Sequence, residues 1–532
     1  MSAEQVTEFC LLAIGFFTIY IDPWETCLQS HSESVASCLL EKNILPNKRQ
    51  LEEIAKIFDG KQKSSIVRKC CSKISENIKG LSEKINGVWP AYRFGENGKE
   101  NFAFVICTNE DIDLNNRLKY EYKIRVIGKC NNEARDVTFS TENISYKMNP
   151  DDTKKIKMFI AKNSRDLLKR QSMLSGISAS SVKSKKYSTN KWEKVPCPCL
   201  VFYVHTKNYI PLDEDPFEKE YDGIPVDVRE GAFTRFGRDG HCSTKYQPDV
   251  KIACEIRGAN SSGTLSGFLE LPDSTDIFGF TCAHAVLSTD VLRKYLLKSG
   301  NKSFNVQPAN ADEKLESMVY QPVNSEEVLG NVVKVAYQEG GKGTSGMEIA
   351  IVKLQKARYP ISGKISDFES ETNEHTFETG KVAERASIQY GEDVVKFGST
   401  SGISQGRIAF DDATVRGLSF PWNKDDCVIL YNQLEVWSLN LHERFAVNGD
   451  SGAPVYVSRN DELNCVGIVE GGYDIGNCVV TPVDGLLREL AIRSLKDFRG
   501  YPSRKEKSET TNIKQDVLPR HVRKRKCIGR LH

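Results

Sequence analysis

The stretch Asn448-Gly449-Asp450-Ser451-Gly452-Ala453-Pro454 determines how the rest of the chain is interpreted. Glycines on both sides of Ser451 allow a tight turn that presents the serine hydroxyl. The main-chain N–H groups of Gly449 and Ser451 can then point at one spot, where they would stabilise a developing oxyanion. The same residue types also suit an ordinary solvent-exposed turn. Taken alone, the stretch is therefore compatible with a nucleophilic serine and with a surface turn.

Two upstream segments favour the nucleophile. Phe278-Gly279-Phe280-Thr281-Cys282-Ala283-His284-Ala285-Val286 predicts a strand that ends in a small-residue turn carrying His284. A serine nucleophile needs a base, and imidazole titrates near neutral pH. Further along, Glu348 comes directly before the apolar run Ile349-Ala350-Ile351-Val352, and a carboxylate can hold the imidazole tautomer. The candidate catalytic residues are therefore His284, Glu348 and Ser451, with the N–H groups of Gly449 and Ser451 as the oxyanion hole.

These three segments resemble the catalytic segments of the chymotrypsin-like (trypsin-fold) serine proteases in identity and chain order. Residues 394–402 are similar to a hairpin strand of bacterial members, and residues 466–472 to the strand that pairs with the substrate backbone. The resemblance covers residues 250–495. It implies a pair of six-stranded antiparallel barrels followed by a C-terminal helix, with the catalytic residues in the cleft between the barrels. It implies neither a metal nor another cofactor.

The resemblance also places the substrate-binding residues. Phe445, six residues before Ser451, corresponds to the floor of the substrate pocket, while Glu470, Gly471 and Gly472 lie on the substrate-pairing strand. Because Phe445 is not an acid, we expect an apolar or small substrate side chain rather than Lys or Arg. Arg444 could instead favour acidic residues if its loop shifts.

Three departures from the family limit this interpretation. Glu348 stands where an aspartate is usual, so an inactive, degraded triad stays open as an alternative. The residue after His284 is Ala285, and the disulfide pattern of the secreted members is missing. No zymogen-type activation site precedes the domain. The chain therefore resembles the bacterial and intracellular branches of the family.

Composition restricts the compartment and the partners. The net charge of +2 over 532 residues argues against electrostatic binding of nucleic acid or membranes by the whole chain. Sixteen cysteines without a secretory signal indicate reduced thiols in the cytoplasm or nucleus. Residues 9–21 are apolar but too short to span a bilayer, so a buried helix is expected. Cys70-Cys71 and Cys197-Pro198-Cys199 lack a second ligand pair at zinc spacing.

Periodicity divides the chain into six regions. Residues 3–88 repeat near 3.6, residues 100–148 alternate as strands up to Val137-Phe139, and residues 151–169 predict a capped helix. The expected regions are 1–95, a helical bundle that could bind a protein partner; 96–170, a small α+β region; 171–191, a flexible Ser/Lys-rich linker; 192–249, a strand–helix–strand accessory module; 250–497, the protease domain; and 498–532, a basic disordered tail.

Three functions are compatible with these patterns. The first is an intracellular serine endopeptidase, cytoplasmic or nuclear, that acts on peptides or proteins without a membrane partner. The second is an inactive protease-fold adaptor that acts through the N-terminal helical module. The third is weak nucleic-acid binding through the linker and the tail, where residues 521–526 resemble a nuclear-localisation patch that a solvated tail would also explain.

Overall fold

The computed structural model describes most of the chain between residues 22 and 500. The expected helix at 9–21 and all of the tail beyond residue 500 lie outside the described residues. Within the described ranges, no helix combines the length and the apolar character needed to cross a membrane. These ranges are 22–58, 65–94, 100–115, 117–140, 148–186, 192–237, 248–299, 302–308, 310–366, 375–417, 428–440 and 443–500.

Four short helices begin the described chain, as the N-terminal periodicity predicts: α2 (Pro23–Ser30), α3 (Glu33–Glu41), α4 (Lys48–Ile57) and α5 (Ser65–Lys79). The side chains of Asp22, Ser32 and Asn47 cap the first three, and Asn47 forms a reciprocal capping box with Gln50. The apolar faces of the helices share one core with strands β1 (Ile85–Phe94) and β2 (Glu100–Thr108). The helices therefore pack on a sheet as well as on one another.

This small sheet has the order β3-β2-β1-β6, with β3 (Tyr122–Val126) parallel to β2 and β6 (Ile210–Pro211) antiparallel to β1. The strand expected at Val137-Phe139 is wrong, because the structure has helix α6 (Asn132–Thr138) there, capped by the Asn131 side chain. The helix expected at 151–169 is confirmed as α8 (Pro150–Arg170).

The expectation of a flexible linker at 171–191 is wrong, because strand β4 (Leu174–Lys185) lies there. β4 pairs antiparallel with β5 (Glu193–Val204) on one side and with β19 (Gly402–Arg416) on the other. Its serines are buried and hydrogen-bonded: Ser178 donates to the Glu435 carboxylate, and Ser184 donates to Asp227 at 2.8 Å. A serine-rich stretch is typical of exposed chain only where its hydroxyls lack such buried acceptors.

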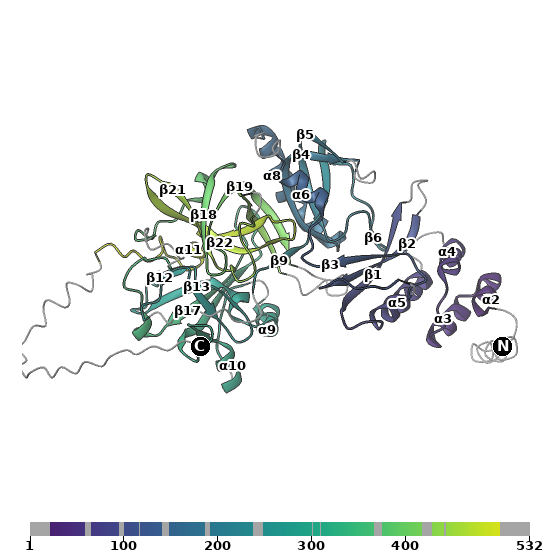
Figure 1. Cartoon of the computed structure of the whole chain (residues 1–532), viewed down its shortest axis with the longest axis horizontal. Helices are drawn as coiled ribbons and strands as arrows, with labels where there is room; N and C mark the ends of the chain where they lie inside the picture. The colour runs from purple at the N-terminus through teal and green to yellow at the C-terminus, as the bar shows by residue number, and fades with distance from the viewer. Residues whose placement is uncertain are drawn as a thin grey trace, which may run out of the picture.

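The accessory module expected at 192–249 extends the same sheet. β8 (Ile224–Glu230) runs parallel to β5, and β7 (Glu220–Tyr221) pairs with β8. The expected strand–helix–strand order is wrong, because the described chain between β5 and β8 forms short strands and turns in place of the helix. The helix that packs on β4 and β5 is α8, which comes earlier in the chain. Figure 1 shows α6 and α8 beside these strands.

Two sheets make up the C-terminal half. The first has the order β11-β10-β15-β16-β17-β13-β12, with β14 on β16; in the second, β18-β21-β22-β23-β20-β19 closes into a ring because β18 also pairs with β19. The ring has the six antiparallel strands expected of one barrel, whereas the first sheet has eight strands, so a double six-stranded barrel stays a prediction. The strands are β10 (Glu255–Arg257), β11 (Ser262–Thr264), β12 (Gly267–Glu270), β13 (Ile277–Cys282), β14 (Phe304–Asn305), β15 (Met318–Tyr320), β16 (Val328–Gln338), β17 (Met347–Leu354), β18 (Asp393–Gly398), β20 (Ile429–Ser438), β21 (Pro454–Arg459), β22 (Glu462–Tyr473) and β23 (Cys478–Pro482).

Helices are sparse in this half: α9 (Thr289–Ser299), α10 (Ala311–Glu316) and α11 (Asp484–Glu489), the last at the place expected for the C-terminal helix. One apolar cluster joins the first sheet to residues of the second, among them Phe397 and Tyr456, and another lies among the strands of the second sheet. The N-terminal helices and the two sheets of the C-terminal half lie at opposite ends of an elongated molecule (Figure 1).

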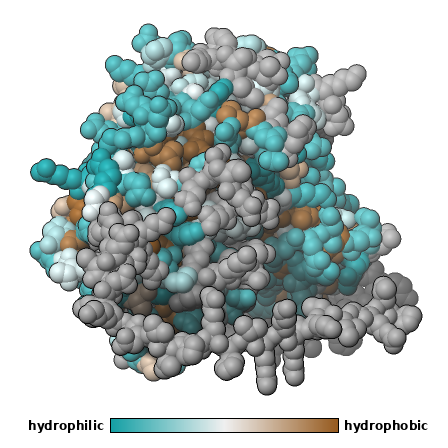
Figure 2. Space-filling model, turned by 60° about the vertical axis from the view of Figure 1, so that its left-hand side comes forward, coloured by the Kyte–Doolittle hydropathy of each residue, from teal (hydrophilic) through white to brown (hydrophobic). Residues whose placement is uncertain are grey.

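Among the coloured residues on the face drawn in Figure 2, hydrophilic ones predominate, and apolar ones appear between them. The most exposed large apolar side chains of the described residues are likewise scattered along the chain. They are Met158, Leu315, Ile361, Ile403 and Leu439.

Candidate active site

Ser451 lies in a turn that enters β21, and its side chain is fully buried. Gly449 has φ of 99° and Gly452 has φ of 85°, a backbone conformation that residues with a Cβ rarely adopt. A Cβ on Gly452 would also lie 2.3 Å from the Thr264 carbonyl oxygen. The glycines on both sides of Ser451 are therefore required by the turn itself, as the sequence pattern suggests.

His284 lies on a short 3-10 turn, Ala283–Ala285, which follows β13. Its Nε2 is 2.6 Å from Ser451 Oγ, although the two residues are 167 positions apart in sequence. This is hydrogen-bond distance for a base that accepts the serine proton. The structure therefore brings together the two residues that the sequence analysis pairs.

Glu348 lies near the start of β17, which pairs with β13, and its side chain is fully buried. Its Oε1 accepts a hydrogen bond from the His284 main-chain N–H at 2.8 Å and lies 3.5 Å from His284 Nδ1. Its Oε2 accepts from Arg235 at 2.9 Å. The third expected catalytic residue thus lies on the correct side of the imidazole, at ion-pair distance from Nδ1.

Burial and neighbouring charges act together on the pKa values of His284 and Glu348, and the net effect lowers both. Burial lowers the pKa of His284 below its usual value, against the opposing effect of Glu348, which favours the neutral imidazole that a base requires. Burial alone would raise the pKa of Glu348, but Arg235 and His284 outweigh it and lower this pKa. Glu348 is therefore the ionised carboxylate of the site.

Glu470 supplies a second buried carboxyl beside His284. Its Oε1 lies 3.5 Å from His284 Nδ1, and its Oε2 accepts a hydrogen bond from Thr481 at 3.3 Å. Burial first, and the charge of Glu348 second, raise the pKa of Glu470, so this carboxyl keeps its proton near neutral pH. The side chain faces the imidazole, while the main-chain carbonyl of Glu470 accepts from Ser451 Oγ at 3.3 Å.

A buried ion pair holds the turn that carries Gly449 and Ser451, the expected oxyanion donors. Asp450 Oδ2 lies 2.9 Å from Lys396 Nζ on β18, and both side chains are fully buried. Asp450 also accepts from the main-chain N–H groups of Thr400, Ser401 and Val447 at 3.1–3.2 Å. An internal lysine therefore balances the charge of the acid next to Ser451, the expected nucleophile.

A segment of the same chain packs beside Ser451. Strand β9 (Phe233–Arg235) pairs antiparallel with β22, with Arg235 opposite Gly471 and Thr234 opposite Gly472. The Gly449 N–H donates to the main-chain carbonyl of Phe236 at 2.6 Å. The expected substrate-pairing strand and one expected oxyanion donor are thus both engaged by residues 233–236. Figure 1 shows β9 beside β22.

Phe445 is fully buried in an apolar cluster that also contains Phe236, Ala446 and Val469. A Cβ placed on Gly472 would lie 2.7 Å from the Phe236 ring, so this glycine leaves room for the aromatic side chain. Apolar surroundings are what the sequence analysis expects of the substrate pocket. The substrate-binding roles of Phe445, Glu470, Gly471 and Gly472 stay predictions.

Among the described residues, Cys282, His284 and Glu470 place donor atoms close enough together to hold a metal ion, all within 4.8 Å of one another. Burial raises the pKa of the Cys282 thiol well above its usual value. The thiol also donates to the Val469 carbonyl at 3.2 Å. A metal ion bound here would have to displace the proton from sulfur, because a metal needs the thiolate.

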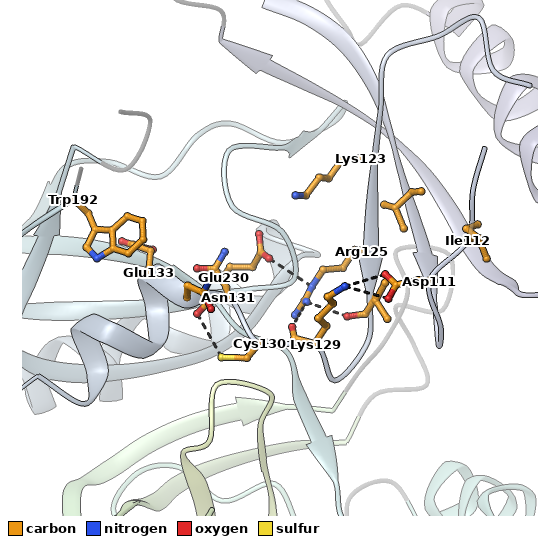
Figure 3. A pocket seen from close by; sticks show the side chains of 13 residues that line it. Asp111, Ile112, Lys123, Arg125, Lys129, Cys130, Asn131, Glu133, Trp192 and Glu230 are labelled. Atoms are coloured by element: carbon orange, nitrogen blue, oxygen red, sulfur yellow. Dashed lines mark hydrogen bonds and ion pairs between the residues drawn. The ribbon is translucent and has the colours of Figure 1, made fainter. Parts of the chain in front are cut away.

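A separate cavity of about 780 Å³ lies away from the catalytic residues, between β3 and α6 (Figure 3). Charges of both signs line it, and Lys129 pairs there with Asp111 at 3.0 Å. Arg125 in its wall bonds Asp474, next to the end of β22. The cavity therefore borders the contact between the N-terminal sheet and the C-terminal half.

No family model matches the chain, and no curated protein matches it. Several solved structures are similar to part of it. A glutamic-acid-specific serine protease with a histidine triad in substrate binding is 14% identical, covering 46% of this chain and 100% of its own, at a TM-score of 0.30. Thermobifida fusca protease A is 13% identical, covering 47% and 99%, at 0.30, and Cellulomonas bogoriensis chymotrypsin is 14% identical, covering 46% and 98%, at 0.27.

The sequence analysis missed three residues that shape the site: Arg235, Lys396 and the side chain of Glu470. Lys396 could have been found, because a lysine within the apolar run Val394-Val395-Lys396-Phe397 needs a buried partner. Arg235 carried no such signal, because its partner Glu348 is 113 residues away.

Proposed function

We propose that this protein is a serine endopeptidase of the chymotrypsin-like type that hydrolyses peptide bonds through an acyl-enzyme intermediate. The observation that carries the proposal is the 2.6 Å contact between His284 Nε2 and Ser451 Oγ, with Glu348 on the opposite side of the ring. A nucleophile, a base and an orienting acid in this order are what acyl transfer requires. A cytoplasmic or nuclear location and a protein partner of the N-terminal helices stay predictions.

The chemistry follows from the positions of these atoms. Ser451 Oγ attacks the scissile carbonyl carbon while His284 Nε2 takes the hydroxyl proton. The Gly449 N–H, and that of Ser451, stabilise the oxyanion of the tetrahedral intermediate. His284 then protonates the leaving amine, and water attacks the resulting ester by the same route in reverse. Glu348 stabilises the imidazolium that forms in each half of the reaction.

The proposed substrate has a large apolar or aromatic side chain on the acyl side of the scissile bond. The apolar cluster around Phe445 and the packing of the Phe236 ring against Gly472 support this preference. A buried ring gains on the order of 2–3 kcal/mol from transfer out of water, whereas a charged side chain would lose its hydration there.

Labelling with a fluorophosphonate probe tests the proposal. Wild-type protein, or protein whose cleft has been emptied by Phe236→Asp, should be labelled at Ser451, and Ser451→Ala should abolish the label. Ser458→Ala is the matched control, because Ser458 lies on the following strand, β21, and is exposed. Folded protein that stays unlabelled with an emptied cleft would exclude a functional catalytic serine.

The inactive adaptor is the second candidate, because the chain's own residues 233–236 occupy the cleft. It predicts that Ser451→Ala leaves the cellular phenotype intact, while deletion of residues 22–79 abolishes it. The peptidase predicts that Ser451→Ala alone is sufficient for loss of function.

A further inference from the structure

We propose that the peptide bond between Phe236 and Gly237 is a substrate of this protein's own active site and is cleaved within the same chain. The proposal rests on the proposed peptidase function and names a first substrate for it. It concerns described residues on both sides of the bond, 232–237, which connect β8 to the catalytic half.

The main chain of this segment lies as an extended substrate would. β9 adds an antiparallel strand to the edge of β22, with Thr234 opposite Gly472 and Phe233 opposite Tyr473. Addition of a strand to an exposed sheet edge is a general way in which proteins bind extended peptides. Register is fixed by this pairing, and it leaves Phe236 as the first residue beyond the paired strand, next to Ser451.

The carbonyl of Phe236 occupies the position that a scissile carbonyl needs. Its oxygen accepts the Gly449 N–H at 2.6 Å, and Gly449 donates from the same turn that carries Ser451. On the leaving side, a Cβ placed on Gly237 would lie 3.5 Å from His284 Cδ2, so Gly237 lies against the imidazole. The oxyanion donor, the nucleophile and the base therefore surround this one bond.

The side chains of the segment also match the site. Phe236 is 4% exposed and belongs to the apolar cluster that contains Phe445. Arg235, the preceding residue, donates to Glu348 Oε2 at 2.9 Å, so the bound segment contributes a positive charge beside the catalytic acid. The combination of an aromatic residue at the scissile carbonyl and a cation before it defines the sequence that the cleft accepts.

Hydrogen bonds that attach the segment 232–237 to the rest of the fold favour cleavage within the same chain. The segment follows β8 directly, and the Gly231 N–H donates to the Val204 carbonyl at 2.8 Å. The Phe233 N–H donates to Ser175 Oγ at 2.8 Å, and the Ala232 N–H donates to Asp474 at 3.3 Å. These bonds hold the scissile carbonyl near the nucleophile, which replaces a bimolecular encounter by an intramolecular one.

The reaction is a hydrolysis that balances with water alone. Ser451 Oγ forms a bond to the Phe236 carbonyl carbon, and its proton moves to His284 Nε2. The bond to the Gly237 nitrogen breaks, and His284 returns the proton to this nitrogen as it becomes a free amine. Water then adds to the Phe236–Ser451 ester, His284 shuttles the proton back to Ser451, and Phe236 leaves as a carboxylate.

The test compares purified full-length wild type with Ser451→Ala by intact mass and by N-terminal sequencing. Wild type should yield fragments 1–236 and 237–532, the second starting Gly237-Arg238-Asp239, while Ser451→Ala stays one chain. Gly237→Pro should block cleavage, and Gly237→Ala is its matched control, because a Cβ there meets His284 only at ordinary contact distance.

Three outcomes separate this proposal from the proposed function. Intact wild type whose Ser451 takes a fluorophosphonate label would overturn self-cleavage and leave the peptidase function standing, with β9 as an inhibitor. If wild type stays intact and neither wild type nor Phe236→Asp takes the label, both self-cleavage and the peptidase function are overturned. Cleavage of Ser451→Ala by added wild type, at a rate that rises with enzyme concentration, would replace cleavage within a chain by cleavage between chains.

Discussion

At the scale of single residues, the feature that distinguishes this site is a pair of buried carboxyls around one imidazole. His284 Nδ1 lies 3.5 Å from Glu348 Oε1 and 3.5 Å from Glu470 Oε1. Two adjacent carboxylates cannot both ionise cheaply in a buried site. Arg235 stabilises the charge on Glu348, so the proton resides on Glu470. One carboxyl can then act as the ionised partner of the base while the other fills space as a neutral group.

This division of roles predicts unequal effects of two matched substitutions. Glu348→Gln should lower kcat by about 10⁴-fold, because a neutral amide no longer stabilises the imidazolium. Glu470→Gln should leave kcat within about threefold, because it replaces a group that is already neutral. Turnover of a peptide containing the sequence Phe-Thr-Arg-Phe-Gly measures both. Equal losses in the two variants would contradict the assignment of charge.

Glu470 should also make stability depend on pH. The folded protein holds a proton that the unfolded chain releases above the ordinary carboxyl pKa, because burial raises the pKa of Glu470. Stability is therefore lost as pH rises from the ordinary carboxyl pKa toward the raised one. Glu470→Gln removes this loss, so its free energy of unfolding should exceed that of wild type more at pH 7.5 than at pH 4.5. Urea unfolding at both values tests it, and a difference independent of pH would contradict it.

The lowered pKa of His284 predicts the acid limb of the rate profile. Activity requires the neutral imidazole, so the rate rises as pH increases through this pKa, and burial by the bound segment moves the rise below the usual value of about 6.5. The pH dependence of kcat measures this pKa, because kcat reports the ionisation of groups in the enzyme–substrate complex. A midpoint of kcat above pH 7 would show that the bound imidazole is not desolvated as the structure indicates.

At the scale of elements, strands far apart in sequence hold the turn that carries Gly449 and Ser451, the proposed oxyanion donors. β18 carries Lys396, which pairs with Asp450 in the turn before β21. The charge of Asp450 is therefore balanced by a lysine side chain rather than by an N-terminal amine released by cleavage. Breaking a buried pair leaves one charge without a partner, which is far costlier than losing an exposed pair.

Lys396→Met should therefore lower the free energy of unfolding by about 3–5 kcal/mol. Lys381→Met is the matched control, since Lys381 pairs with Glu462 at the surface and should change stability by less than about 1 kcal/mol. Chemical denaturation gives both values. The double variant Lys396→Met with Asp450→Asn should recover part of the loss, and a double variant with the sum of the two single losses would argue against the pair.

At the scale of the whole molecule, the regions before the C-terminal half are joined to it by a shared sheet and by side-chain hydrogen bonds. β4 adds to β19, Arg416 donates to the main-chain carbonyls of Leu168 and Ser172 at 2.7 Å each, and Arg125 pairs with Asp474. A chain cut between Phe236 and Gly237 should hence stay one particle, because these contacts join the two fragments without the covalent bond.

Size-exclusion chromatography tests this expectation. The cut protein should elute at the volume of intact Ser451→Ala in native buffer, and the two fragments should separate in concentrated guanidinium chloride. Native elution as two species would mean that the sheet formed by β4 and β19 does not hold the fragments together.

The sequence by itself determined the candidate nucleophile, base and acid, and the antiparallel strands around them, because each lies in a short segment whose residue types carry its own signal. It also predicted a helical N-terminal region, in which α4 and α5 match the stated repeats, and the capped helix α8, because periodicity and caps are local. It misjudged residues 171–191, because a serine-rich stretch does not reveal which buried carboxylates will accept its hydrogen bonds. The tertiary structure alone decided that Lys396 holds Asp450, that Glu470 faces His284 and that residues 233–236 occupy the cleft. Each of these depends on partners more than fifty residues apart, which only the pairing of strands brings within reach.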